Sequence, residues 1–168
     1  MSIAERLLPE FDREFAATRK FLALVPDDKL GWKPHAKSME LGRLAWHVSD
    51  FPGYALGVAS QPGFSVKAED LPKRRSAWVG KDRAAILSRF DSDLKAGREA
   101  LQAIPDSAWD DHWKLEFGGH VVFDDARRIA YRMLAINHMI HHRAQLGLYL
   151  RLNDIPIPGT YGPSADEV

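Results

Sequence analysis

The sequence predicts an all-α protein, a four-helix bundle with a short β-hairpin or extended loop before the last long helix. Two observations support this prediction. Four long segments place apolar residues three or four positions apart, the spacing of one helix face, and stretches rich in proline and glycine separate them. With 168 residues, the chain is expected to form a single domain over 1–168.

Two helices are predicted in the first third of the chain. The first covers residues 2–25, with Pro9 as a bend or a late start. Its apolar residues Ile3, Leu7, Leu8, Phe11, Phe15 and Leu22 keep to one side of a helical wheel. After a loop around 30–35, Ser38 is the expected N-cap of the second helix, and Pro52-Gly53 should interrupt that helix.

The remaining segments complete the bundle. Residues 60–80 are expected to form a long loop, and a third helix is predicted over about 82–103. Between 109 and 123, apolar and polar residues alternate around two glycines, which predicts the hairpin or extended loop. A fourth helix should run from Asp124 or Asp125 to Leu152, and the proline-rich residues 153–168 should lie extended against the bundle.

Composition limits the classes of function. Lysine plus arginine and aspartate plus glutamate number 23 each, so no long-range field attracts nucleic acid or a charged membrane. The basic runs at 73–75 and 127–128 are interpreted as solvated surface. No cysteine is present, so any metal must be bound by nitrogen and oxygen ligands. With no apolar signal core or membrane-spanning run, the protein is expected to be cytoplasmic.

Three of the seven histidines lie in one five-residue stretch of the predicted fourth helix, at positions 138, 141 and 142. His138 and His142 are four apart, so they stack on one helix face and can share a metal ion. The alternative is a pair of core histidines whose hydrogen bonds are made with tyrosine or backbone groups. His141 projects to another side. His112 and His120, in the predicted hairpin, are expected to be exposed.

His47 adds a third candidate ligand from the inward edge of the second helix. Three imidazoles leave coordination positions open, the arrangement of a catalytic metal site. Asp50 lies one turn beyond His47 and Gln145 one turn beyond His142, so either could orient a ligand ring from outside. Both could equally be surface residues.

The fourth helix has two apolar stripes when projected at 100° per residue. One holds Ile129, Met133, Ile136, Ile140, Ala144 and Gly147, and the other Tyr131, Leu134, His138, His142, Gln145 and Tyr149. A third sector, with Arg128, Arg132, Met139 and Arg143, is predicted to face solvent in part. One stripe is expected to face the core and the other a neighbouring helix, in the same chain or in a second subunit.

Four segments resemble one known family. They are Leu44-Ala45-Trp46-His47-Val48, the run from Asn137 to Leu146, the loop Trp32-Lys33-Pro34-His35, and the ending from Leu150 to Ser164. Together they resemble the DinB-like (DinB/YfiT) superfamily. The resemblance implies an up-down-down-up bundle, frequently a homodimer. It also implies one divalent metal ion, most often zinc or nickel, held by three histidines at the matching positions His47, His138 and His142.

The expected function is therefore that of a divalent-metal-binding protein. The resemblance adds, as first candidate, a metal-dependent thiol S-transferase or related detoxification enzyme that uses a low-molecular-weight thiol cosubstrate. A metal-dependent hydrolase is the second enzymatic choice. The alternatives are a non-enzymatic, stress-responsive protein that binds a metal or small molecule, and a structural bundle without metal. Arg143 is a candidate for binding an anionic cosubstrate, and the sequence assigns no role to His35.

Overall fold

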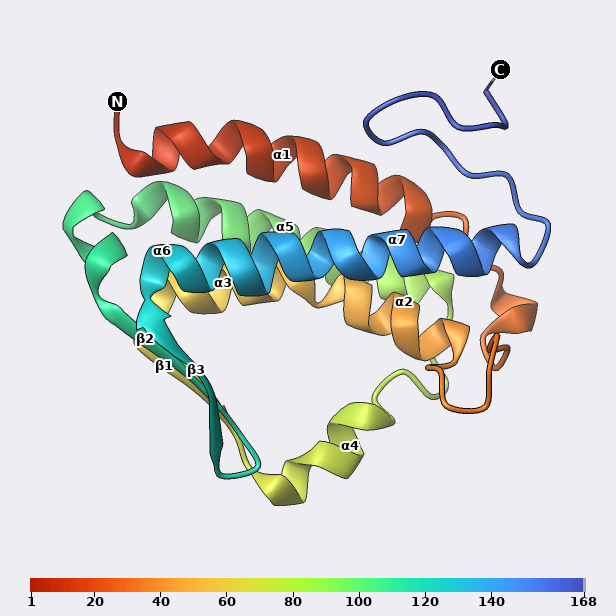
Figure 1. Ribbon diagram of the computed structural model, residues 1–168, viewed down its shortest axis with the longest axis horizontal. Coiled ribbons are helices and arrows are strands. Elements are labelled where there is room, and N and C mark those ends of the chain that lie inside the picture. Colours follow the sequence, from red (N-terminus) through yellow and green to blue (C-terminus); the bar gives the residue numbers. More distant parts are fainter. Residues whose placement is uncertain (168) are drawn as a thin grey trace.

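The computed structural model describes residues 1–167 and contains four helical rods, a small sheet and a short helix (Figure 1). The first rod is α1 (Ile3–Leu22), and the second is divided into α2 (Leu41–Ser49) and α3 (Phe51–Ser60). The third is α5 (Arg83–Ala103), and the fourth joins α6 (Arg127–Ala130), the π-helix η4 (Tyr131–Asn137) and α7 (His138–Arg151). The first and fourth rods run in one direction and the other two run oppositely, an up-down-down-up order (Figure 1).

The all-α prediction is wrong, because the chain also forms a three-stranded sheet. Its strands are β1 (Gly63–Val66), β2 (His112–Phe117) and β3 (His120–Ala126), in the order β1-β2-β3. The expected hairpin is β2–β3, which turns at Gly118-Gly119 with positive φ at both residues. Such two-residue turns favour glycine. Because β3 continues to Ala126, the fourth rod begins at Arg127 and not at 124 or 125.

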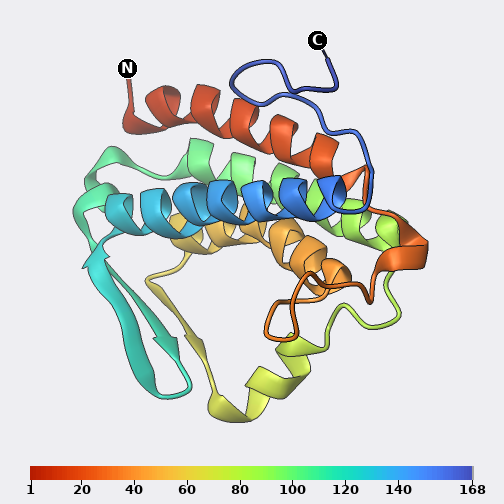
Figure 2. The ribbon, with the colours of Figure 1, turned by 45° about the vertical axis from the view of Figure 1, so that its right-hand side comes forward.

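Residues 60–80, expected as a loop, are mostly ordered into short elements. They contain β1, the 3-10 turn η2 (Ala68–Asp70) and the helix α4 (Leu71–Arg75). β1 pairs in parallel with β2, which lies beyond the whole of α5 in the sequence. Parallel strands are joined by a long connection, so their partners lie far apart in the sequence. The four residues of β1 alone therefore do not predict this pairing. Figures 1 and 2 show the sheet and α4 on the same side of the rods.

The helix ends differ in detail from the predictions. Ser2 caps α1 through a capping box, because its hydroxyl accepts from the Glu5 amide and the Glu5 carboxylate accepts from the Ser2 amide. Pro9 therefore does not delay the helix. The N-cap of α2 is Glu40, so the Ser38 prediction is wrong. The second rod is interrupted at Asp50, just before Pro52-Gly53. Two further 3-10 turns are η1 (Asp27–Lys29) and η3 (Asp106–Asp110).

Arg127 fastens the start of the fourth rod. Its buried guanidinium donates to the backbone carbonyls of Val58, Gln61 and Ala108. It thereby joins the end of α3 and the turn η3 to the rod that carries His138 and His142. The interpretation of Arg127 as solvated surface is wrong, whereas its neighbour Arg128 is exposed and pairs with Asp110.

The fourth rod does not follow one helical period. Met139 and Arg143 are buried, although they were expected to face solvent with Arg128 and Arg132, which are exposed. The π-helix Tyr131–Asn137 begins between Arg128 and Arg132 and ends before Met139, and its i→i+5 hydrogen bonds add residues to each turn. A projection at 100° per residue therefore assigns residues after the π-helix, such as Met139 and Arg143, to the wrong face.

Some apolar side chains on and just after the fourth rod lie at the protein surface. Met133, Leu148 and Leu152 remain more than half exposed. The homodimer stays a prediction, which light scattering would test.

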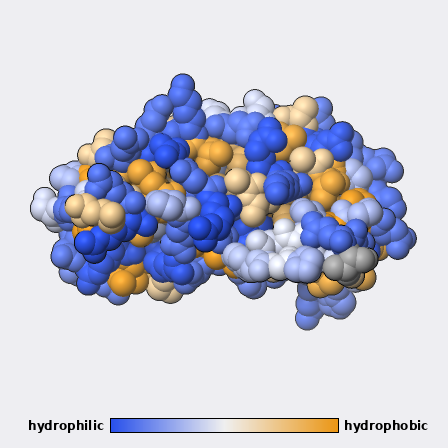
Figure 3. Space-filling view, turned by 90° about the horizontal axis from the view of Figure 1, so that it is seen from above, coloured by the Kyte–Doolittle hydropathy of each residue, from blue (hydrophilic) through white to orange (hydrophobic). Residues whose placement is uncertain are grey.

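The face that carries α1 and the C-terminal tail is hydrophilic over most of its area, with apolar patches between (Figure 3). None of the helices within residues 1–167 combines the length and apolar character that a membrane span requires.

Candidate metal centre

The rings of His47, His138 and His142 meet between α2 and α7. One ring nitrogen from each lies within 4.8 Å of the others. The Nε2 atoms of His138 and His142 are 3.0 Å apart, and the His47 ring centroid is 5.2 Å from that of His138 and 4.7 Å from that of His142. Two nitrogens bound to one tetrahedral zinc ion lie roughly 3.3 Å apart. The three donors are therefore spaced to share one ion after small ring movements.

Local structure explains why the rings converge. His138 is the first residue of α7, directly after the π-helix, and regular α-helical spacing then places His142 one turn further on the same face. α2 crosses α7 and ends at Ser49, so His47 lies in its last turn and faces the pair. No described side chain or backbone group hydrogen-bonds the His47 ring. Its nitrogen therefore remains free to bind an ion.

Gln145 orients one of the three rings, whereas Asp50 does not. The Gln145 Oε1 atom lies 2.7 Å from His142 Nδ1. A proton on Nδ1 donated to that oxygen leaves the His142 Nε2 lone pair facing the cluster. Asp50 forms an ion pair with Arg89, whose guanidinium also lies 4.3 Å from the ring centroid of Trp46. Of the two candidate orienting residues, only Gln145 therefore contacts a ring of the cluster.

Burial keeps the cluster in the uncharged form that binds metals. Removal of the ring from water lowers the pKa of His47 to about 3, with smaller contributions from His142, His138, Arg43 and Arg74. Burial, followed by His142 and His141, lowers the pKa of His138 to about 4. The pKa of His142 is also lowered by burial, against a smaller raising effect of Gln145. All three imidazoles are therefore neutral at pH 7.

Two aromatic residues enclose the cluster. The Phe51 ring lies 4.9 Å from those of His47 and His138, between centroids. Tyr54 meets both histidines edge-on at 6.5 and 6.3 Å. Burial raises the pKa of Tyr54, so its hydroxyl stays protonated and can donate a hydrogen bond. No role at the site was predicted for Phe51 and Tyr54, although they follow His47 by four and seven residues, the spacing of one helix face.

A cavity of about 300 Å³ opens in front of the cluster. Its lining comprises Met39, Arg43, Trp46, His47, Asp50, Tyr54, Leu71, Arg74, Arg75, Trp78, Phe117 and His142. A second cavity of about 200 Å³ shares Asp50, Tyr54 and Arg74 with it. The segment 61–80 between α3 and α5 and the strand β2 supply part of these walls. The cluster is therefore accessible to a small molecule.

The other histidines take no part in the cluster. His141 is exposed, and its ring lies 4.8 Å from that of His142 between centroids but contributes no nitrogen to the cluster. His112 and His120 are exposed, as expected. His35 is an exposed loop residue whose Nδ1 accepts from the Lys37 amide.

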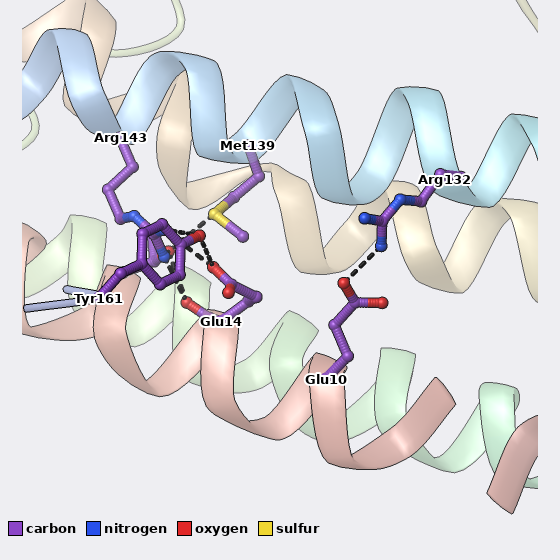
Figure 4. A network of polar contacts seen from close by, with 7 residues as sticks. Glu10, Glu14, Arg132, Met139, Arg143 and Tyr161 are labelled. Atoms are coloured by element: carbon purple, nitrogen blue, oxygen red, sulfur yellow. Dashed lines mark hydrogen bonds and ion pairs between the residues drawn. The ribbon is translucent and has the colours of Figure 1, made fainter. Parts of the chain in front are cut away.

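Arg143 is not available to bind a cosubstrate. It is buried between α1 and α7, where its guanidinium pairs with the Glu14 carboxylate at 2.8 Å and donates to the Glu14 carbonyl and the Tyr161 hydroxyl (Figure 4). Tyr161 in turn donates to the Glu14 carboxylate. Arg143 therefore fastens the C-terminal tail and α1 to the fourth rod.

Acidification is expected to destabilise the chelator-treated, metal-free protein. The pKa of His47 is about 3 in the folded chain and 6.5 for an unperturbed histidine, so below pH 6.5 the unfolded chain binds the extra proton. The stability that depends on neutral His47 is complete above pH 6.5 and is lost as the pH falls toward 3. The loss at pH 5 is about 2 kcal/mol. Urea unfolding at pH 7.5 and 5 should show a smaller loss for His47→Gln than for the parent, and equal losses would contradict this assignment.

Comparisons with known proteins identify relatives of this chain. The family model of the DinB superfamily matches residues 10–146. The uncharacterized protein YrdA of Bacillus subtilis (strain 168) is 28% identical over 166 residues, covering 97% of this chain and 90% of YrdA. A DinB-like protein from Bacillus cereus ATCC 10987 has a similar structure, with a TM-score of 0.70, 25% identity, and coverage of 94% of this chain and 97% of that one.

A second solved structure is similar in fold alone. The DinB-like protein YjoA of Bacillus subtilis has a TM-score of 0.68 and 15% identity, over 92% of this chain and 96% of its own. Since the family model spans most of the sequence, the chain belongs to the DinB superfamily.

Proposed function

We propose that His47, His138 and His142 hold one divalent metal ion, zinc or nickel, and that the protein uses it in a reaction of a small molecule. The observation that carries this proposal is the convergence of three neutral, partly buried imidazoles at the end of an accessible cavity. Core histidines normally satisfy one another or nearby polar groups. Here the His47 ring has no described hydrogen-bond partner and the donor set is complete for an open site.

The chemistry that such an ion supplies is Lewis-acid activation, including a lower pKa for a bound thiol or water. The protein's own residues supply the rest. Gln145 holds the His142 ring with Nε2 toward the cluster. Phe51 and Tyr54 restrict water around the rings, and the Tyr54 hydroxyl is available to donate to a substrate atom.

A thiol nucleophile fits the cavity better than water does. Within the described residues, Asp50 is the only carboxylate that lines the 300 Å³ cavity, and it is already paired with Arg89. Tyr54 stays protonated. The described lining therefore has no unpaired base to accept the proton of a metal-bound water, whereas a thiol, with a pKa of about 8.5, can lose its proton to solvent before it binds. This difference favours a thiol S-transferase over a hydrolase.

The test has two stages. Untagged protein purified without chelator should contain a divalent metal in stoichiometric amount by elemental analysis. The metal-loaded protein should then conjugate monochlorobimane with glutathione, bacillithiol or mycothiol, and the chelator-treated protein should not. Stoichiometric metal without conjugation for any thiol would instead support the non-enzymatic binding protein. Metal below roughly a tenth of the stoichiometric amount would overturn the site itself, since an occupied structural or catalytic site holds its ion through purification.

Replacing Gln145 by leucine is expected to weaken metal binding without unfolding the chain. Leucine keeps the volume but removes the oxygen that holds the His142 ring. Loss of such an outer partner lowers metal affinity roughly 10–100-fold. Competition with a colorimetric chelator would measure the change. Asn137→Leu, at an exposed position one residue before His138, serves as the matched control and should leave the affinity unchanged.

A further inference from the structure

Three arginines line the cavity in front of the histidines. Arg43 lies on α2 four residues before His47, and therefore on the same helix face. Arg74 and Arg75 approach from α4, in the crossover between α3 and α5. Two separate parts of the chain thus place guanidinium groups at one cavity.

The three side chains lack the acidic partners that structural arginines of this protein have. Arg143 is paired with Glu14, and Arg89 with Asp50 and Asp93. In contrast, none of the cavity arginines forms an ion pair with a carboxylate in residues 1–167. Nearby carboxylates are engaged elsewhere, Asp50 and Asp93 with Arg89 and Glu40 with Lys33.

The arginines also act electrostatically on the cavity. Arg43 and Arg74 both contribute, after burial, to the lowered pKa of His47, and Arg74 opposes the raised pKa of Tyr54. Arg74 is further held over the Phe64 ring, 5.4 Å from its centroid. Within the described chain, the lining thus contains three unpaired cations and one carboxylate that is already neutralised, so its field is positive.

We propose that this cavity binds its ligand through a carboxylate or phosphate group held by Arg43, Arg74 and Arg75, with the ligand's other end at the histidines. The planar guanidinium fork suits both groups, because it donates two parallel hydrogen bonds to paired oxygens. The inference rests on the proposed metal site for the position of the second end. Lys73, Arg74 and Arg75 are all exposed, so the interpretation of the run 73–75 as solvated surface is confirmed, and the proposal adds a ligand-binding role for Arg74 and Arg75.

Three thiols of similar length test the anionic group. Cobalt-loaded protein is titrated with 2-mercaptoethanol, 3-mercaptopropionate and 2-mercaptoethyl phosphate, and binding is followed by the thiolate-to-cobalt absorption band. At least one charged thiol should bind about tenfold or more tightly than the neutral one, since charged groups make the stronger hydrogen bonds. The tighter of the two identifies carboxylate or phosphate as the preferred group. Equal affinity for all three would overturn the proposal.

Matched variants separate binding of the anionic group by particular arginines from the effect of the total positive charge. The double substitution Arg43→Met with Arg75→Met should abolish the preference for the charged thiols and leave 2-mercaptoethanol binding unchanged. Lys73→Met removes one positive charge from the same helix but lies outside the cavity, so it should keep the preference. An equal loss in Lys73→Met would mean that only the overall field matters, and would overturn specific recognition.

A measurement without metal makes this inference independent of the metal site. Trp46 and Trp78 line the cavity, Trp109 and Trp113 are buried, and the partly buried Trp32 is outside the cavity lining and gives a background that all variants share. In metal-free protein, the double arginine variant should lower the quenching of tryptophan fluorescence by iodide by roughly half and leave quenching by neutral acrylamide unchanged. This result without cobalt binding would mean that the metal function fails while anion recognition stands. Unchanged iodide quenching would overturn the anion site.

Discussion

Replacing His138 by alanine is expected to reduce bound divalent metal from a stoichiometric to a background amount. The variant keeps two of three nitrogen donors, and those two come from different rods. The loss of affinity should exceed the roughly 10–100-fold that removal of an outer partner causes. Elemental analysis of untagged, chelator-free protein after dialysis is the direct measurement.

His141→Ala is the matched control for this experiment. His141 lies on the same helix and next to His142, but its ring is outside the cluster and its side chain is exposed. It should retain the metal content of the parent protein. If both variants keep the metal, or if both lose it equally, the three-histidine assignment is wrong.

The largest stability effect is expected at Glu14. Glu14→Ala leaves the Arg143 guanidinium, 3% exposed, without its carboxylate, and the Tyr161 hydroxyl loses its acceptor (Figure 4). Breaking a buried ion pair from one side costs about 3–5 kcal/mol of unfolding free energy. Urea denaturation followed by circular dichroism would measure it.

Two further variants interpret that result. The pair Glu10–Arg132 joins the same two rods at the surface, so Glu10→Ala should cost no more than about 1 kcal/mol (Figure 4). The double change Glu14→Leu with Arg143→Met should recover much of the loss, because it removes the unpaired charge and keeps apolar volume. A cost at Glu14 no greater than at Glu10 would refute the buried pair as a structural clamp.

The histidine cluster could be anticipated because its information is local to two helices. A four-residue spacing places His138 and His142 on one face wherever the helix is regular, and the segment from 138 to 151 is regular. His47 required only that the second rod pack against the fourth. These are statements about short stretches of chain, which sequence patterns describe well.

The parts that escaped prediction depend on non-local geometry. The π-helix before His138 has no simple composition, and it rotated Met139 and Arg143 from the expected solvent side into the core. β1 is ordered by a partner strand far away along the chain, as the register Gly63↔Lys114 shows. Arg74 and Arg75 line the cavity because the segment between α3 and α5 folds back beside the rods, and no periodicity within that segment predicts this placement.

The crossover has a consequence for how this protein can diversify. α4 makes few contacts with the rods, and the segment is anchored beside them by Trp78, whose ring lies where a side chain on Gly42 would be. The residues that would hold the metal lie on the rods, whereas two of the three cavity arginines, Arg74 and Arg75, lie on α4. Exchange of residues 67–77 alone would therefore change which small molecules bind in the cavity and leave the three histidines unchanged. The proposed metal centre and two of the three arginines proposed to bind the ligand therefore lie in separable stretches of one chain.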